Sequence, residues 1–384
     1  MQVSVVSCLT FSYGASMNEN VTQPLANILP KFPQDSAFQT ELHRRVEEHF
    51  TITGKPQRDC PRMYLKTIII LLSFAASYGI LVFIPMSWWL AIPVATWLAL
   101  SVTAIGFNIQ HDAGHRAYSR FAWVNKVMSW TIDMVGGSSY MWHWKHGVFH
   151  HTYTNIAGHD SDIELGFLGR LCPHQKRYSF HRWQHFYLWP LYGLVVVKWN
   201  LFDDFHSYIT GRIGENRYPR PKGWDLVVFI AGKVVFFSIT FVIPMLFHTW
   251  WHVLLAYLYI SLLTGIVLSI VFQLAHCDEV ARFPLPDEAS HRMDQGWAIH
   301  QAETTVDFAP RSRLLTWLLG GLNFQIEHHL FPRICHTNYP AISKIVEQVC
   351  RDFGVPYHVH GTFWAAMKAH YQWLRQMGQA PAMA

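Results

Sequence analysis

Four long apolar blocks separate the polar parts of the chain, at residues 67–85, 89–107, 226–247 and 253–275. Each is close to the length of about 20 residues that an α-helix needs to cross a bilayer. The connectors within the two pairs of blocks are very short, "MSWW" and "HTWWH". Each pair therefore predicts a helical hairpin with an aromatic tip at a membrane interface.

Basic residues are absent from both connectors but frequent elsewhere. Arg58, Arg62 and Lys66 precede the first block, and the long segment 108–224 holds many more. Because cytoplasmic loops carry the excess of Lys and Arg, the pattern predicts that both termini and the 108–224 segment are cytoplasmic. The predicted fold is an all-α integral membrane protein, with two transmembrane hairpins and a cytoplasmic helical cap.

This organisation divides the chain into five segments. They are a cytoplasmic N-terminal segment, the first hairpin, a cytoplasmic region, the second hairpin and a cytoplasmic C-terminal region, at 1–63, 64–107, 108–224, 225–275 and 276–384.

Several shorter features complete the pattern. Residues 36–53 predict a charged amphipathic helix, and the apolar stretch 187–197 is too short to cross a membrane, so we expect a helix in the membrane plane. Residues 1–17 lack the basic start and continuous apolar core of a signal peptide, and are expected to form a flexible tail. Lys233, inside the third block, is expected to extend toward the cytoplasmic interface and is given no functional role.

The composition agrees with a membrane protein. Of 384 residues, 51% are hydrophobic and 14% charged, whereas soluble domains carry about 25% charged residues. The net charge of +5 follows no basic run, which argues against nucleic-acid binding. The six cysteines form no CxxC motif, so neither a zinc knuckle nor a disulfide framework is indicated, and we expect reduced thiols.

The 24 histidines are clustered. Three groups, "HDAGH", "HGVFHH" and "QIEHH", contain pairs spaced i,i+4, which share one face of a helix. A further histidine ends the fourth apolar block, and the predicted topology brings all of these groups to one membrane surface. The candidate metal ligands are His111, His115, His146, His150, His151, His276, Gln325, His328 and His329.

A single interfacial histidine is more often a hydrogen-bonded surface residue than a ligand, but eight converging histidines would repel one another if protonated. Neutral imidazole is the commonest metal ligand, and imidazoles without thiolates suit zinc, copper, iron or nickel. One zinc takes about four ligands, so eight or nine donors indicate two metal ions. The residues alone predict a membrane di-metal site, with a redox pair of iron ions favoured and no catalytic residue apart from the ligands.

The order HxxxH, HxxxHH and QxxHH, with a hairpin between the second and third boxes, resembles the membrane-bound fatty-acid desaturases. The resemblance is strongest to front-end acyl-lipid desaturases of cyanobacterial type, often called delta-6 desaturases. It extends through "HHTYTNIAGHDSDIE" (150–164), "GGLNFQIEHHLFPRICHTNYP" (320–340) and "FGVPYHVHGTF" (353–363). Glutamine at the head of the third box is the mark of the front-end enzymes.

The resemblance implies a non-haem di-iron enzyme that uses dioxygen and two electrons to place a cis double bond in a membrane-lipid acyl chain. The box histidines match the family's iron ligands, and His276 matches the ligand outside the boxes. Gln325 stands where another ligand would be, reaching the metal directly or through water. Ala113 and Gly114 depart from some relatives within the first box.

An unactivated methylene C–H offers no acidity, so a cofactor must supply the oxidant while the protein supplies position. Outer groups commonly accept the second N–H of metal-bound imidazoles. The carboxylates beside the boxes are candidates for this role, namely Asp112, Asp160, Asp162 and Glu327.

The sequence contains no HPGG motif of a fused cytochrome b5 domain, so a separate electron donor is expected. For cyanobacterial relatives this implies ferredoxin, with cytochrome b5 as the alternative, at a thylakoid or plasma membrane. A basic surface could dock an acidic donor or bind anionic lipids; its residues are Arg116, Arg120, Lys126, Lys145, Lys176, Arg177 and Arg182.

Two other functions use similar residues. An acyl or lipid hydroxylase, or a ketolase, has similar histidine boxes, although "TYTNIAGHDSDIE" and "QIEHHLFP" favour desaturation. A histidine-rich metal transporter would carry its histidines within the membrane helices or in a low-complexity loop, whereas here they lie in ordered motifs just outside the apolar blocks.

Overall fold

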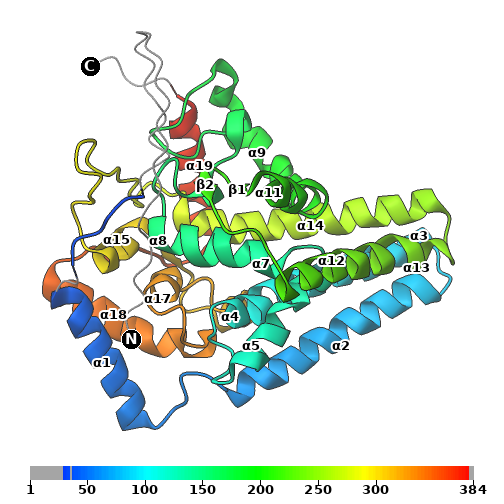
Figure 1. Ribbon diagram of the computed structural model, residues 1–384, viewed down its shortest axis with the longest axis horizontal. Coiled ribbons are helices and arrows are strands. Elements are labelled where there is room, and N and C mark those ends of the chain that lie inside the picture. Colours follow the sequence, from blue (N-terminus) through cyan, green and yellow to red (C-terminus); the bar gives the residue numbers. More distant parts are fainter. Residues whose placement is uncertain (1–28, 35–36, 380–384) are drawn as a thin grey trace.

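A computed structural model describes residues 29–34 and 37–379; the expected flexible tail at 1–17 lies outside these ranges. Four helices are long and apolar enough to cross a membrane: α2 (Pro61–Phe83), Trp88–Gly114, Trp224–Met245 and α14 (Trp250–His276). In Figure 1 they run side by side and project from one side of the remaining helices. We call these four helices the stem and the rest of the described chain the cap.

The stem confirms the two predicted hairpins. Its second helix is longer than expected, because α3 (Trp88–Ala104) continues through a π-helical segment, Ile105–Gln110, into α4 (His111–Gly114). The prediction that this helix ends before the first histidine box is therefore wrong. The third helix contains α12 (Trp224–Phe237), a π-helical segment Ser238–Val242 and α13 (Ile243–Met245).

The cap is built from short helices and two small strand pairs. In the described residues its α-helices are α1 (Ala37–Thr53), α5 (Ala122–Ser129), α6 (Thr131–Met134), α7 (Ser139–Trp142), α8 (His151–Tyr153), α9 (Gln184–Tyr192), α10 (Leu194–Lys198), α11 (Asp204–Thr210), α15 (Trp297–Thr304), α16 (Arg313–Leu318), α17 (Gln325–Leu330), α18 (Tyr339–Phe353) and α19 (Phe363–Gly378). Its π-helical segments are His143–His150 and Trp199–Asp203, and its 3-10 turns are Ser161–Ile163, Gly166–Leu168, Ser179–Trp183 and His336–Asn338.

The strands pair locally. β1 (Arg212–Ile213) is antiparallel to β2 (Asn216–Arg217), whereas β3 (Asp307–Phe308) is parallel to β4 (Val359–His360). The second pair joins the segment before α16 to the segment before α19. It therefore holds the C-terminal part of the cap together.

The predicted amphipathic helix at 36–53 is confirmed as α1. Its buried residues Phe38, Leu42 and Val46 recur every four positions and belong to one core cluster with Ile342 and Val346 of α18. Burying each such side chain contributes about 1.5–3 kcal/mol. This packing holds α18 beside α17, the helix that carries the third histidine box (Figure 1).

The apolar stretch 187–197 falls within α9 and α10, and its position in the membrane plane stays a prediction. α10 lies close against α14. A Cβ at Gly265 of α14 would come 2.4 Å from the carbonyl oxygen of Gly193. The two backbones can approach this closely only because neither residue has a side chain.

Lys233 does not extend to a membrane interface, so that prediction is wrong. Its side chain is buried in α12, and its Nζ donates hydrogen bonds of 2.6 Å to the Asp204 carboxylate and of 2.6 Å to the Gly136 carbonyl oxygen. A buried ammonium requires such partners. The pair ties the third stem helix to α11 and to the turn after α6.

Candidate metal centre

The candidate ligands converge where the stem meets the cap. His111 and His276 lie at the ends of two stem helices, and the π-helical segment His143–His150 and α17 bring the second and third boxes to the same place. All nine side chains are buried. The structure thus brings together all eight histidines predicted as ligands.

The histidines form two groups linked by a third. In each group, ligand nitrogens lie within 4.8 Å of one another. The first group is His111, His115, His146 and His328, and the second is His150, His276 and His329. His151 lies between the two groups, in a third set with His328 and His329. The arrangement provides two neighbouring positions for metal ions.

Many of the ring nitrogens have no hydrogen-bond partner among the described residues. They are Nε2 of His115, His150, His328 and His329, and both ring nitrogens of His151 and His276. Buried polar atoms are normally paired, because leaving one unpaired costs free energy. The accumulation of unpaired nitrogens at one point is what a set of metal ligands would show without its metal.

The protonation of these rings also suits metal binding. Burial lowers the pKa of His115, His151, His328 and His329 well below the ordinary value, and the neighbouring histidines lower it further. The rings are therefore neutral at physiological pH and have a lone pair to donate. A donor set of neutral imidazoles without thiolates fits iron, zinc, copper or nickel.

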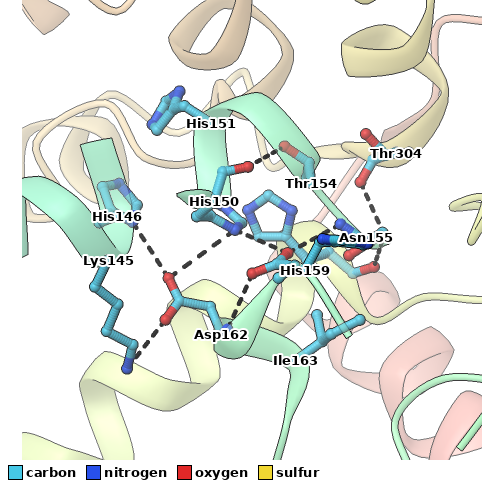
Figure 2. Close-up of polar contacts among 12 residues, drawn as sticks. Lys145, His146, His150, His151, Thr154, Asn155, His159, Asp162, Ile163 and Thr304 are labelled. Carbon is cyan, nitrogen blue, oxygen red and sulfur yellow. Dashed lines mark hydrogen bonds and ion pairs between the residues drawn. The ribbon is translucent and has the colours of Figure 1, made fainter. Parts of the chain in front are cut away.

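Two of the four predicted carboxylates lie at ligand rings. The Nδ1 of His150 donates to Asp160 Oδ2 at 3.0 Å, which directs the unpaired Nε2 toward the other histidines. Asp162 lies between Lys145 and His146 (Figure 2), with its oxygens 3.1 Å from Lys145 Nζ and 3.5 Å from His146 Nδ1. The ion pair with Lys145 keeps Asp162 available as an anion beside the ring.

The other two carboxylates have different partners, so the expectation that they hold ligand rings is wrong. Asp112 accepts a hydrogen bond of 2.8 Å from His336 Nδ1. Glu327 accepts one of 3.0 Å from the Tyr357 hydroxyl. Both side chains follow or precede a ligand in sequence, but helical geometry turns consecutive side chains in different directions.

Two ring partners, Gln301 and Tyr339, were not predicted from the sequence. Gln301 Oε1 lies 2.7 Å from His329 Nδ1 and also accepts from the Thr154 hydroxyl at 2.9 Å. The Tyr339 hydroxyl lies 3.3 Å from His328 Nδ1. Gln301 is in α15, outside any box, and nothing in its local pattern indicates a role. Tyr339 follows the third box within the stretch that resembles desaturases.

Gln325 lies on α17 with His329 one turn further along. Its side chain is buried and its Oε1 has no partner among the described residues. A buried amide oxygen without a partner, on the same helix as His328 and His329, could accept a hydrogen bond from a bound water or donate a lone pair to a metal. The geometry therefore keeps both possibilities for Gln325 that the sequence raised.

Local backbone structure sets the positions of the first two boxes. π-helical segments, which often occur at functional sites, precede His111 and contain His146 and His150. The Trp142 ring stacks on His146, with ring centroids 4.8 Å apart. A Cβ at Gly114 would come 2.2 Å from this indole, so glycine within the first box allows Trp142 to support the second.

Only some of the side chains in the predicted basic surface are exposed and could contact a partner protein. Arg116, Arg120, Lys126, Lys176 and Arg182 are exposed. Lys145, in contrast, is paired with Asp162 beside the metal centre, and Arg177 donates to the Gly378 carbonyl oxygen. These last two side chains have structural partners within the cap.

A four-helix membrane stem that ends in a buried, histidine-rich metal-binding cluster defines a class of membrane metalloprotein. Comparison with known families specifies the class further. Residues 87–361 match the family model described as "Fatty acid desaturase". The chain belongs to the fatty acid desaturase family, and it is an oxidoreductase.

Similar proteins agree with this assignment. The chain is 38% identical to an sn-1 linoleoyl-lipid 6-desaturase of Arthrospira platensis, over 91% of this chain and 95% of the relative. It is also 38% identical to the protein of the same name in Synechocystis sp., over 91% and 98% of the two chains. An acyl-lipid (8-3)-desaturase of Physcomitrium patens is 36% identical over 90% of this chain and 72% of its own length.

Proposed function

We propose that this desaturase is a di-iron enzyme that places a cis double bond near the carboxyl end of a membrane-lipid acyl chain. The observation that supports this most directly is the convergence of eight buried histidines, six of which have at least one ring nitrogen without a partner among the described residues. When bound, two iron ions supply with dioxygen and two electrons the oxidising power that a methylene C–H requires. The chain's own residues bind, orient and enclose these groups.

The proposed ligands are His111, His115, His146, His150, His151, His276, His328 and His329, with Gln325 binding directly or through water. Asp160, Asp162, Gln301 and Tyr339 would fix the ring orientations through the second nitrogens. Burial of the centre would exclude bulk water from the reaction.

The stem supports a lipid substrate. A cavity of about 590 Å³ lies between the two hairpins and has mainly apolar walls, including Phe74, Ala95, Leu98, Phe236 and Ile260. Its walls include the stem helix that begins at Trp88 and α14, which also carry His111 and His276 at their cap ends. An acyl chain that enters this cavity from the membrane would contact apolar side chains of both hairpins. The names of the relatives support an acyl group esterified in a lipid.

A separate electron donor would dock on the cap. The exposed Arg116, Arg120, Lys176 and Arg182 would suit an acidic protein such as ferredoxin, with cytochrome b5 as the alternative, because complementary charge speeds encounter. The distribution of basic residues supports a cytoplasmic cap, at a thylakoid or plasma membrane. The rival function, hydroxylation on the same scaffold, differs in retaining an oxygen atom in the product.

Expression in a host with simple lipids would test the proposal. Mass spectrometry of the lipids should locate a new double bond near the carboxyl end, and the purified protein should contain about two iron ions. His328→Ala should lose iron and activity, whereas His206→Ala, at an exposed cap histidine, should retain both. A hydroxylated product would establish the rival reaction, and full turnover by His328→Ala would rule out the proposed centre.

A further inference from the structure

Two cysteines far apart in sequence meet at the base of α2. Cys60 precedes the first residue of α2, and Cys335 lies just after the third histidine box. Both thiols are buried and free. They share a core cluster with Met63, Ile109 and Ala113. The pair therefore lies beside the stem helix that carries the first box.

The loop around Cys335 connects this thiol pair to the metal centre. Its backbone N–H donates to the Gln57 carbonyl oxygen at 2.8 Å, and Asn338 Nδ2 donates to Cys60 Sγ at 3.7 Å. The next residue in the loop after Cys335, His336, is bound to Asp112, the neighbour of His111 in sequence. At the end of the loop, the Tyr339 hydroxyl contacts His328. Movement of Cys335 would thus displace residues that lie beside His111 and His328.

The same cluster is a poor site for a further metal ion. Donor atoms of Asp112, Cys335 and His336 lie within 4.8 Å of one another. However, Asp112 and His336 already satisfy each other, and the Lys66 ammonium lies 3.1 Å from His336 Nε2. A cation would have to displace these contacts and face the lysine. These contacts argue against metal binding, but they do not prevent oxidation and reduction of the two thiols.

The two thiols are inequivalent. The neighbouring Cys335 thiol lowers the pKa of Cys60, whereas the neighbouring Cys60 thiol and burial raise the pKa of Cys335 well above its ordinary value. Thiolates, not thiols, react with peroxides. By contrast, burial raises the pKa of Cys350 to about 12. The Cys60 sulfur also accepts a hydrogen bond from Asn338 Nδ2, which favours its thiolate, so Cys60 is the thiol that reacts first and Cys335 is the partner that resolves the product.

We propose that Cys60 and Cys335 form a peroxide-sensitive thiol–disulfide switch that turns the enzyme off. Hydrogen peroxide, the two-electron reduction product of dioxygen, is the oxidant. The Cys60 thiol and peroxide give the Cys60 sulfenic acid and one water. The Cys335 thiol then attacks the Cys60 sulfur, forming the disulfide and releasing a second water. Two thiols lose two electrons in total, and one peroxide becomes two waters.

Formation of the disulfide would inhibit turnover because it draws Cys335 toward Cys60. To form the disulfide, the two sulfur atoms must come to about 2.05 Å from one another. Since Cys60 is held at the start of α2 in the stem, we expect the loop that carries Cys335 to make most of the movement. That movement draws on His336 and Tyr339, and so disturbs the positions of His111 and His328. Reduction by a thiol reverses the cross-link and restores the arrangement.

The experiment uses the full-length holoenzyme in lipid nanodiscs, treated with hydrogen peroxide and then alkylated. Proteolysis and mass spectrometry should find the Cys60–Cys335 peptide pair, and turnover should fall at least tenfold and recover with dithiothreitol. Cys335→Ser and Cys60→Ser should resist peroxide. Cys350→Ser is the matched control, because it removes another buried thiol of the cap and should leave the sensitivity intact.

Two results would overturn the switch: oxidised wild-type protein without the Cys60–Cys335 link, or linked protein with undiminished turnover and iron content. If a serine variant fails to fold, cross-link mapping on the wild type still decides. The link is read by mass and its effect also by iron retention, so the result does not depend on which lipid product the enzyme makes. Failure of the proposed function would appear separately, as untreated protein that forms no double bond.

Discussion

Replacing Asp160 with asparagine tests whether this carboxylate sets the tautomer of His150 for metal binding. The Asp160 side chain is fully buried and accepts three hydrogen bonds, from His150 Nδ1 at 3.0 Å, Asn155 N at 2.9 Å and Asp162 N at 2.9 Å. An asparagine has one acceptor oxygen in place of two. The amide oxygen can replace only one of the two carboxylate oxygens. The NH₂ group must then occupy the position of the other.

The substitution therefore acts on the tautomer of His150. If the amide NH₂ faces Nδ1, this nitrogen becomes the acceptor and the proton moves to Nε2, which then has no lone pair for a metal. If the amide is turned the other way, its NH₂ opposes the N–H of Asp162. Loss of such outer partners typically lowers metal affinity by about 10–100-fold, which corresponds to about 1.4–2.7 kcal/mol of binding free energy.

The assay is the iron content of purified Asp160→Asn protein, measured during titration with a chelator, together with double-bond formation. We expect iron to leave the group of His150, His276 and His329 first, so that the content falls from about two ions to about one. Asp203→Asn, which breaks an exposed pair with Lys198, is the matched control. An Asp160→Asn enzyme with two ions of unchanged affinity would refute the reasoning about His150.

Three further predictions concern other parts of the molecule. Gln325→His should retain iron and measurable activity, whereas Gln325→Ile should fold but lose most activity; an active Gln325→Ile with two ions would remove Gln325 from the centre. Burial lowers the pKa of His370 to about 4, so the unfolded chain takes up a proton first as the pH falls from about 6.5 to 4. The free energy of unfolding should drop by about 3 kcal/mol over this range, and thermal unfolding of His370→Gln should depend less on pH there. Lys233→Met should cost about 3–5 kcal/mol, because it leaves the buried Asp204 charge unpaired; Lys233→Met/Asp204→Asn should recover most of that loss, and equal melting temperatures for the two variants would contradict this account.

The sequence predicted the parts of the site that repeat locally. The spacing of His111 and His115, or of His146 and His150, can be read from a few residues, and the lengths of the apolar blocks specify the stem. The charge pattern then brings the boxes to one surface. These predictions succeed because helical periodicity and hydrophobic length are short-range properties of the chain.

Partners that come from distant elements could not be predicted in this way. Gln301 reaches His329 from another helix, and no periodic pattern around it points to a metal centre. Asp112 and Glu327 were misjudged for the same reason, since proximity in sequence does not show which way a side chain turns. Lys233 looked like an interfacial residue because its partner, Asp204, belongs to a separate cap helix.

The spread of the ligands along the chain has a consequence for biosynthesis. The centre draws on residues from His111 to His329, so neither hairpin alone can assemble it. While the chain is being made, the full set of candidate ligands cannot come together until the second hairpin and α17 have been synthesised. Metal loading at the proposed centre would therefore be a late step of maturation.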